Sequence, residues 1–179
     1  MQDSASILDE NLQLLAKRQP ALAEQLRQLP DSRRVPRVPG ARGADTLRDG
    51  EILLGSRYEP GREAERQAGE MAAAAGDLQV AVGFGLGLQL AAFRRLRPVP
   101  LIVFEPDAER LRAALAFAAQ PWLGDDQVRI TTDAAELPDL VQLYYTAGLR
   151  LATHVHPALL RLDAPAARSA LAWLSRTKD

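Results

Sequence analysis

The sequence predicts a three-layer α/β fold, a Rossmann-like parallel sheet with a helical N-terminal extension. Residues 78–176 alternate short apolar runs with amphipathic stretches, a pattern typical of βαβ units. The first apolar run breaks into three glycines on alternate positions, and the next apolar run ends at an acid, Glu105. Such a loop permits a tight turn ahead of a helix N-terminus, and an acid about 20 residues on is typical of nucleotide-binding folds.

The first part of the chain predicts helices followed by a loop. Leucines recur at helical spacing over residues 7–29, and Pro20 lies between the two stripes, where it can open a second helix. Proline and glycine are frequent over residues 30–50, which indicates an extended loop or a short hairpin. The segment 51–55 (EILLG) is a strand candidate, and Glu59–Pro60 opens a helix that runs to about residue 75.

Four strands and four helices are predicted downstream. The strands are expected at 78–83, 100–105, 127–132 and 149–155, and the helices at 87–97, 107–119, 134–147 and 164–176. We divide the chain into an extension, residues 1–50, and a Rossmann-like domain, residues 51–179. A dinucleotide-type sheet carries about six strands, so we expect the chain to be part of a larger protein.

Composition excludes several classes of function. The net charge of −1 favours neither nucleic acid nor an acidic membrane, and the arginines of residues 33–42 have no interleaved aromatic residues for base stacking. With no cysteine, disulfides and thiol chemistry are excluded, and with two histidines no metal site is expected. No secretory signal and no membrane-length apolar run occurs, so we expect a cytoplasmic protein.

The glycine loop supports two interpretations that the sequence leaves open. Gly83, Phe84, Gly85 and Gly87 are candidates for a nucleotide cradle, or the loop is a structural turn. Leu88 stands where the dinucleotide fingerprint has its last glycine or alanine. The loop therefore fits S-adenosylmethionine-dependent methyltransferases better than NAD enzymes.

Two acids follow predicted strands. Glu105 is a candidate acceptor for ribose hydroxyls, expected at an exposed strand end, and Asp107 is expected to cap the next helix. Asp133 lies where methyltransferase-like folds often place an acid near adenine. It also begins a capping box with Glu136, and capping is the preferred interpretation.

Further polar candidates lie elsewhere in the chain. Ser56, Tyr58 and Arg62 belong to a polar segment at a helix start, which is either solvated or able to meet an anion. His154 and His156 are expected on one face of a strand, where a polar strand end is favoured over a metal site.

In their order along the chain, these motifs resemble the N-terminal region of the motility accessory factor (Maf) family. The shared features are the early helix NLQLLAKRQPALAEQL, the segment SRYEP followed by EAER, the loop GFGLG and the later VHPA. The resemblance covers residues 10–170. Glu59 departs from the aspartate usual in the family.

The resemblance implies a function in bacterial motility. Maf proteins resemble glycosyltransferases that attach nonulosonic (sialic-acid-like) sugars from CMP-linked donors to flagellin, with the chemistry in a domain downstream of this region. We therefore expect this chain to support that domain rather than to catalyse, with flagellin as a further partner and S-adenosylmethionine or a CMP-sugar as the possible nucleotide. The alternatives are a methyltransferase-like domain using Gly83–Gly87 and Glu105, and a non-catalytic interaction module.

Overall fold

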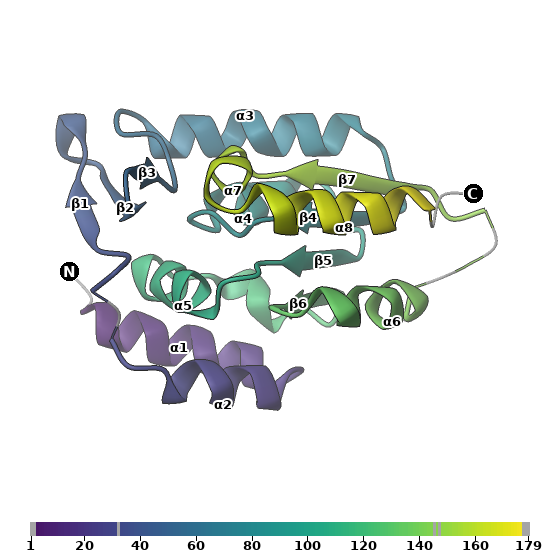
Figure 1. Ribbon diagram of the computed structural model, residues 1–179, viewed down its shortest axis with the longest axis horizontal. Helices are drawn as coiled ribbons and strands as arrows, with labels where there is room; N and C mark the ends of the chain where they lie inside the picture. The colour runs from purple at the N-terminus through teal and green to yellow at the C-terminus, as the bar shows by residue number, and fades with distance from the viewer. Residues whose placement is uncertain (1–2, 32, 145, 147, 177–179) are drawn as a thin grey trace.

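The computed structural model describes residues 3–31, 33–144, 146 and 148–176 (Figure 1). It confirms the mixed α/β fold with a central parallel sheet between two layers of helices. The sheet has the strand order β6-β5-β4-β7, and every neighbouring pair is parallel. Its strands are β4 (Leu78–Val82), β5 (Leu101–Phe104), β6 (Val128–Thr131) and β7 (Leu151–Val155).

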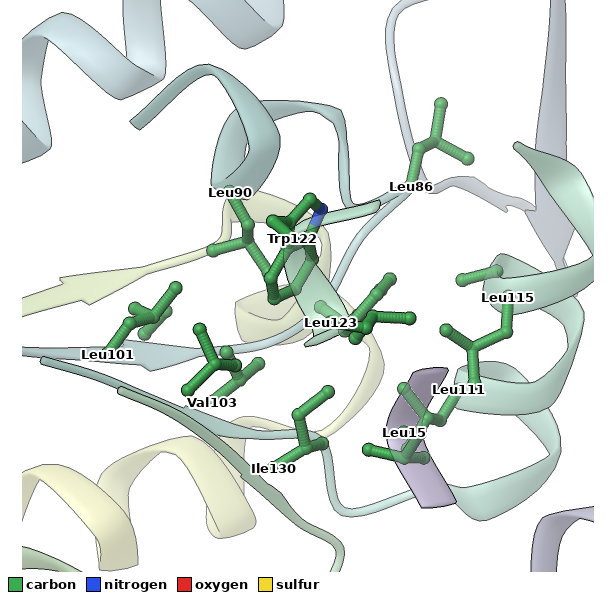
Figure 2. Packing of buried hydrophobic residues seen from close by; sticks show 14 of the residues in the cluster. Leu15, Leu86, Leu90, Leu101, Val103, Leu111, Leu115, Trp122, Leu123 and Ile130 are labelled. Atoms are coloured by element: carbon green, nitrogen blue, oxygen red, sulfur yellow. The ribbon is translucent and has the colours of Figure 1, made fainter. Parts of the chain in front are cut away.

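Alternate strand residues face two separate apolar clusters, as a sheet buried on both sides requires. On one face, Leu101, Val103 and Ile130 pack against the helices that precede and join the first three strands (Figure 2). On the other face, Val80 and Ile102 pack against the last helices. The first layer contains α3 (Pro60–Ala73), α4 (Leu88–Leu96) and α5 (Ala108–Phe117), and the second contains α6 (Leu137–Gln142) and α8 (Ala164–Arg176).

The N-terminal residues form two helices and a small antiparallel sheet. These elements are α1 (Ser4–Ala16), α2 (Pro20–Gln28), β1 (Arg37–Pro39), η1 (Ala41–Gly43), β2 (Asp45–Asp49) and β3 (Ile52–Leu53), with β2 pairing with both other strands. Pro20 opens α2 as predicted. The small sheet lies beside the carboxyl ends of the parallel strands (Figure 1).

Asn11 ties α1 to the loop that follows α5. Its side-chain amide donates to the carbonyls of Leu115 and Ala118 at 2.7 and 2.8 Å, and its Oδ1 accepts the N–H of Gln120 at 2.8 Å. Gln120 in turn donates from its side chain to the carbonyl of Leu86, in the glycine loop, at 3.0 Å. The N-terminal helix therefore fixes a residue that contacts the candidate site.

The structure differs from the predicted elements in several places. The predicted helix 134–147 is a 3₁₀ turn, η3 (Ala134–Glu136), followed by α6, which ends at Gln142, and residues 145 and 147 lie outside the described part. Pro138 explains the late start, because proline is tolerated only in the first turn of an α-helix. The sequence pattern also missed η2 (Pro121–Gly124) and α7 (Pro157–Leu162), both too short for helical periodicity.

Among the described residues, no helix combines the length and the apolar character that a membrane crossing needs.

Candidate functional site: the crevice at the carboxyl edge of the sheet

The glycine loop joins β4 to α4 and is buried along its whole length, Gly83 to Gly87. Gly83, Gly85 and Gly87 have φ angles of 100°, 58° and 77°, which explains why the turn uses glycine. The N–H of Gly83 donates to the carbonyl of Phe104, and the N–H of Gly87 donates to that of Phe84. These loop amides are thus used within the protein.

The loop borders the point where the sheet order reverses, between β4 and β7. In open α/β sheets, ligands bind in the crevice outside this point. Here side chains of the chain itself fill the crevice. A Cβ atom placed on Gly85 would lie 2.4 Å from Nε2 of His156, and one on Gly87 would lie 2.5 Å from Nε2 of Gln120.

The remaining space confirms how closely the crevice is filled. The hollow bounded by Gly85, Arg110 and Leu159 has a volume of about 0 Å³. The hollow on the side of α3, bounded by Gln67, Leu86 and His156, has a volume of about 10 Å³. A buried water needs at least about 10–15 Å³ measured this way, so no nucleotide fits without movement of these side chains.

Glu105, the candidate ribose acceptor, is one of the most buried polar residues, with an exposed fraction of 1%. The expectation of an exposed strand end is therefore wrong. One carboxylate oxygen accepts the N–H of Phe84 at 3.0 Å, and the other accepts Nη1 of Arg110 at 2.8 Å and the N–H of Asp107 at 3.3 Å. Burial raises the pKa of Glu105, and the Arg110 guanidinium opposes that rise.

Arg110 extends this contact into the N-terminal part of the chain. Its Nε donates to Asp49 at 3.0 Å, and Asp49 also pairs with Arg34, whose guanidinium reaches Asp107 at 2.6 Å. Arg110 and Asp49 are buried, with exposed fractions of 5% and 6%. This network closes the crevice from the side of the small sheet, and each charged group in it contacts at least one group of opposite charge.

His156 seals the crevice from the end of β7. It lies just beyond the strand, where its Nδ1 accepts the N–H of Ala158 at 3.2 Å and caps α7. Nδ1 as acceptor places the proton of the neutral ring on Nε2. Burial, together with the nearby His154, lowers the pKa of His156 to about 4, so the ring is neutral at pH 7.

His154 lies within β7, and burial lowers its pKa as well. In the described part of the chain, no group of three metal-ligating residues occurs, and Nε2 of His154 is buried without a hydrogen-bond partner. The two histidines are thus packed side chains in this structure.

Asp133 does not meet the glycine loop, because β5 lies between β6 and β4. The side chain is exposed and accepts the N–H of Ala135 at 2.8 Å, as a cap of η3. Glu136 bonds instead to the hydroxyl of Thr131 at 2.6 Å, so the reciprocal half of the predicted capping box is not formed.

Ser56, Tyr58 and Arg62 surround the start of α3. The Ser56 hydroxyl accepts the N–H groups of Tyr58 and Glu59, and the Ser56 N–H donates to Glu63 at 2.6 Å. The side chain of Arg62 is 83% exposed and pairs with Glu59, while Tyr58 is 62% exposed. The serine therefore shapes the helix entry, and the other two side chains face solvent.

Sequence reasoning missed Arg110 and Asp49 as members of the site, and it did not place His156 in the crevice. Asp49 and Arg110 are 61 residues apart, and no local pattern joins them. The one local signal was the pair Glu105 and Arg110, five residues apart. Glu105 follows a predicted strand and Arg110 lies in the first turn of the next helix, so the two side chains could have been expected to meet.

Comparison with known proteins supports the fold. No family model and no curated protein matches the sequence. Among solved structures, the Maf glycosyltransferase from Magnetospirillum magneticum AMB-1 is similar over 97% of this chain, with a TM-score of 0.68 and 14% identity. The chain covers 35% of that protein. MNMC2 from Aquifex aeolicus matches with a TM-score of 0.31 and 16% identity, covering 80% of this chain and 50% of that one.

Proposed function

We propose that this chain is the Rossmann-like module of a Maf-like glycosyltransferase and that it supports sugar transfer without performing it. The observation that carries the proposal is the closed crevice: His156, Gln120 and Arg110 occupy the place where a nucleotide would bind. The fold likeness to a Maf glycosyltransferase over 97% of the chain adds support, as do the ordered motifs of the sequence.

The chemistry of the buried polar groups also favours a supporting role. Glu105 is held by Arg110 and two backbone N–H groups, so its carboxylate is engaged. His156 is engaged at Nδ1 as a helix cap, and its low pKa makes it a poor base near pH 7. Each of these groups thus serves the packing of the module.

In this proposal, a catalytic domain of the same protein lies against the module. That domain transfers a nonulosonic sugar from a CMP-linked donor to flagellin in the cytoplasm. A methyltransferase-like role would require S-adenosylmethionine to displace Arg110 and His156 from the crevice. We therefore favour the supporting role.

The test is genetic and uses flagellin itself as the readout. We expect deletion of the segment encoding this chain from its native gene to lower the intact mass of flagellin by whole nonulosonic acid units. Restoration with the wild-type segment should return the mass, and so should Arg62→Ala, which changes only a solvated side chain. Flagellin of unchanged mass after the deletion would contradict the proposal.

A further inference from the structure

A buried polar side chain, Gln67, borders the crevice from α3. It lies on the inner face of the helix, and only 2% of it is exposed, among the apolar residues Ala64, Ala68 and Met71. Its Oε1 atom is buried and accepts no hydrogen bond from the residues that the structure describes. Buried polar side-chain atoms in folded proteins nearly always have a partner, which is either protein or ordered water.

The ring of His156, which seals the crevice, has a donor to place as well. Its Nδ1 accepts the N–H of Ala158, so the proton of the neutral ring is on Nε2. Within the described part of the chain, no acceptor is bonded to this Nε2–H. The crevice therefore buries an acceptor on Gln67 and a donor on His156, each in need of a partner.

Both side chains line the hollow on the side of α3, whose volume is about 10 Å³. One buried water needs at least about 10–15 Å³ on the same measure, so this hollow is at the lower limit for a single water and admits nothing larger. The hollow beside Gly85 and Arg110 differs in both respects. Its volume is about 0 Å³, and the guanidinium there already bonds to the carboxylate of Glu105.

A third polar group completes the lining. Glu63 lies one helical turn before Gln67 on α3 and borders the same hollow. Its Oε2 accepts the N–H of Ser56 at 2.6 Å, which leaves the other carboxylate oxygen for a further donor. A buried water typically makes about three hydrogen bonds. Here it can donate to Gln67 and Glu63 and accept from His156, which uses both of its hydrogens.

We propose that a single water molecule binds in this hollow and bridges Oε1 of Gln67 and the Nε2–H of His156. A cation of similar size would face the hydrogen of that N–H, whose partial charge is positive, so the donor favours water. The bridge fixes the ring at both nitrogens, and a Cβ placed on Gly85 would lie 2.4 Å from the same Nε2. Gln67 is thus a positioning residue: through the water, α3 holds the ring that closes the glycine loop.

The direct test is a crystal structure of the chain at a resolution that shows ordered waters. We expect one density peak within about 3.2 Å of both Gln67 Oε1 and His156 Nε2. No density there, or a direct hydrogen bond between the two side chains, would overturn the proposal. A peak with contacts of about 2.0–2.6 Å would mark a metal ion and would overturn it too.

Two matched variants test the bridge in solution. Gln67→Leu removes the buried acceptor, and Gln13→Leu makes the same change at an exposed position of α1. Because Gln67→Leu expels the water and leaves the N–H of His156 without an acceptor, its melting temperature should fall by at least about 2–4 °C relative to Gln13→Leu. In a dry hollow the same substitution would remove an unsatisfied group and raise the melting temperature. An unchanged or higher value would therefore refute the bridge.

A spectroscopic signal separates the water from packing. The ring C–H protons of His156 should show NMR cross-relaxation with a long-lived water in the wild type and in Gln13→Leu, and should lose it in Gln67→Leu. A folded wild-type chain without this signal would contradict the proposal. Should Gln67→Leu fail to fold, the crystal structure and the wild-type signal decide. None of these outcomes depends on sugar transfer.

Discussion

Replacing Gly85 with alanine probes the packing of the crevice. The new Cβ would lie 2.4 Å from Nε2 of His156, on a backbone with φ of 58°. His156 cannot easily yield, because its N–H bonds to Val82 and its ring caps α7. A left-handed conformation costs about 1–2 kcal/mol for an L-residue, and overpacking costs about 1–3 kcal/mol. We expect Gly85→Ala to lower the free energy of unfolding by about 2–5 kcal/mol.

Gly50 provides the matched control. Its φ of 57° is nearly that of Gly85, but a Cβ placed there meets nothing within 4 Å. Gly50→Ala therefore carries the backbone cost alone, about 1–2 kcal/mol. Urea unfolding followed by circular dichroism gives both values, and the melting temperature should fall by about 2–4 °C for each kcal/mol. A loss in Gly85→Ala no larger than that in Gly50→Ala would refute the close packing of His156 against the loop.

Three further outcomes are expected. Glu105→Gln removes the charge beside buried Arg110 and should destabilise the chain by about 2–3 kcal/mol in urea unfolding, since two acids still pair with the arginine; a loss near zero would contradict the network. The pKa of His156 is about 4 in the folded chain, against the ordinary value of 6.5 expected in the unfolded chain. Between these two pH values, the His156 ring is therefore more often protonated in the unfolded chain than in the folded one. Stability should therefore fall by about 3 kcal/mol as pH drops from about 6.5 to about 4, and His156→Asn should flatten this part of the profile; an equal slope in the variant would argue against a buried neutral ring. Ser56→Ala should cost about 1 kcal/mol through loss of the bonds at the start of α3, whereas Arg62→Ala should stay within about 0.5 kcal/mol; equal effects would remove the structural role of the serine.

The elements of the fold follow from local patterns in the sequence. The alternation of apolar runs and helical stripes places all four parallel strands to within one or two residues at each end. Pro20 opens α2, and Asp107 caps α5 by accepting the N–H of Arg110 at 2.9 Å, both as predicted. These features depend on neighbours in sequence, which is why they can be read from one chain.

The state of the site could not be predicted in the same way. The sequence pattern of a glycine loop followed by an acid is the same whether the crevice is open or closed, because the backbone needs the same tight turn in both cases. Closure depends on Arg110 meeting Asp49, on His156 meeting Gly85, and on the link from α1 through Gln120. These contacts join residues far apart in the chain, so only the folded structure brings them together.

The closed crevice is tested most directly by the amide NMR signals of Gly83, Gly85 and Gly87 during titration with nucleotides. S-adenosylmethionine, CMP, a CMP-linked nonulosonic sugar and NAD would each be added to the folded chain at millimolar concentration. We predict that the three amide signals do not move, because the loop is buried beneath His156 and Gln120. Saturable shifts of these signals with any of the four nucleotides would show that the loop binds a ligand and would contradict the account.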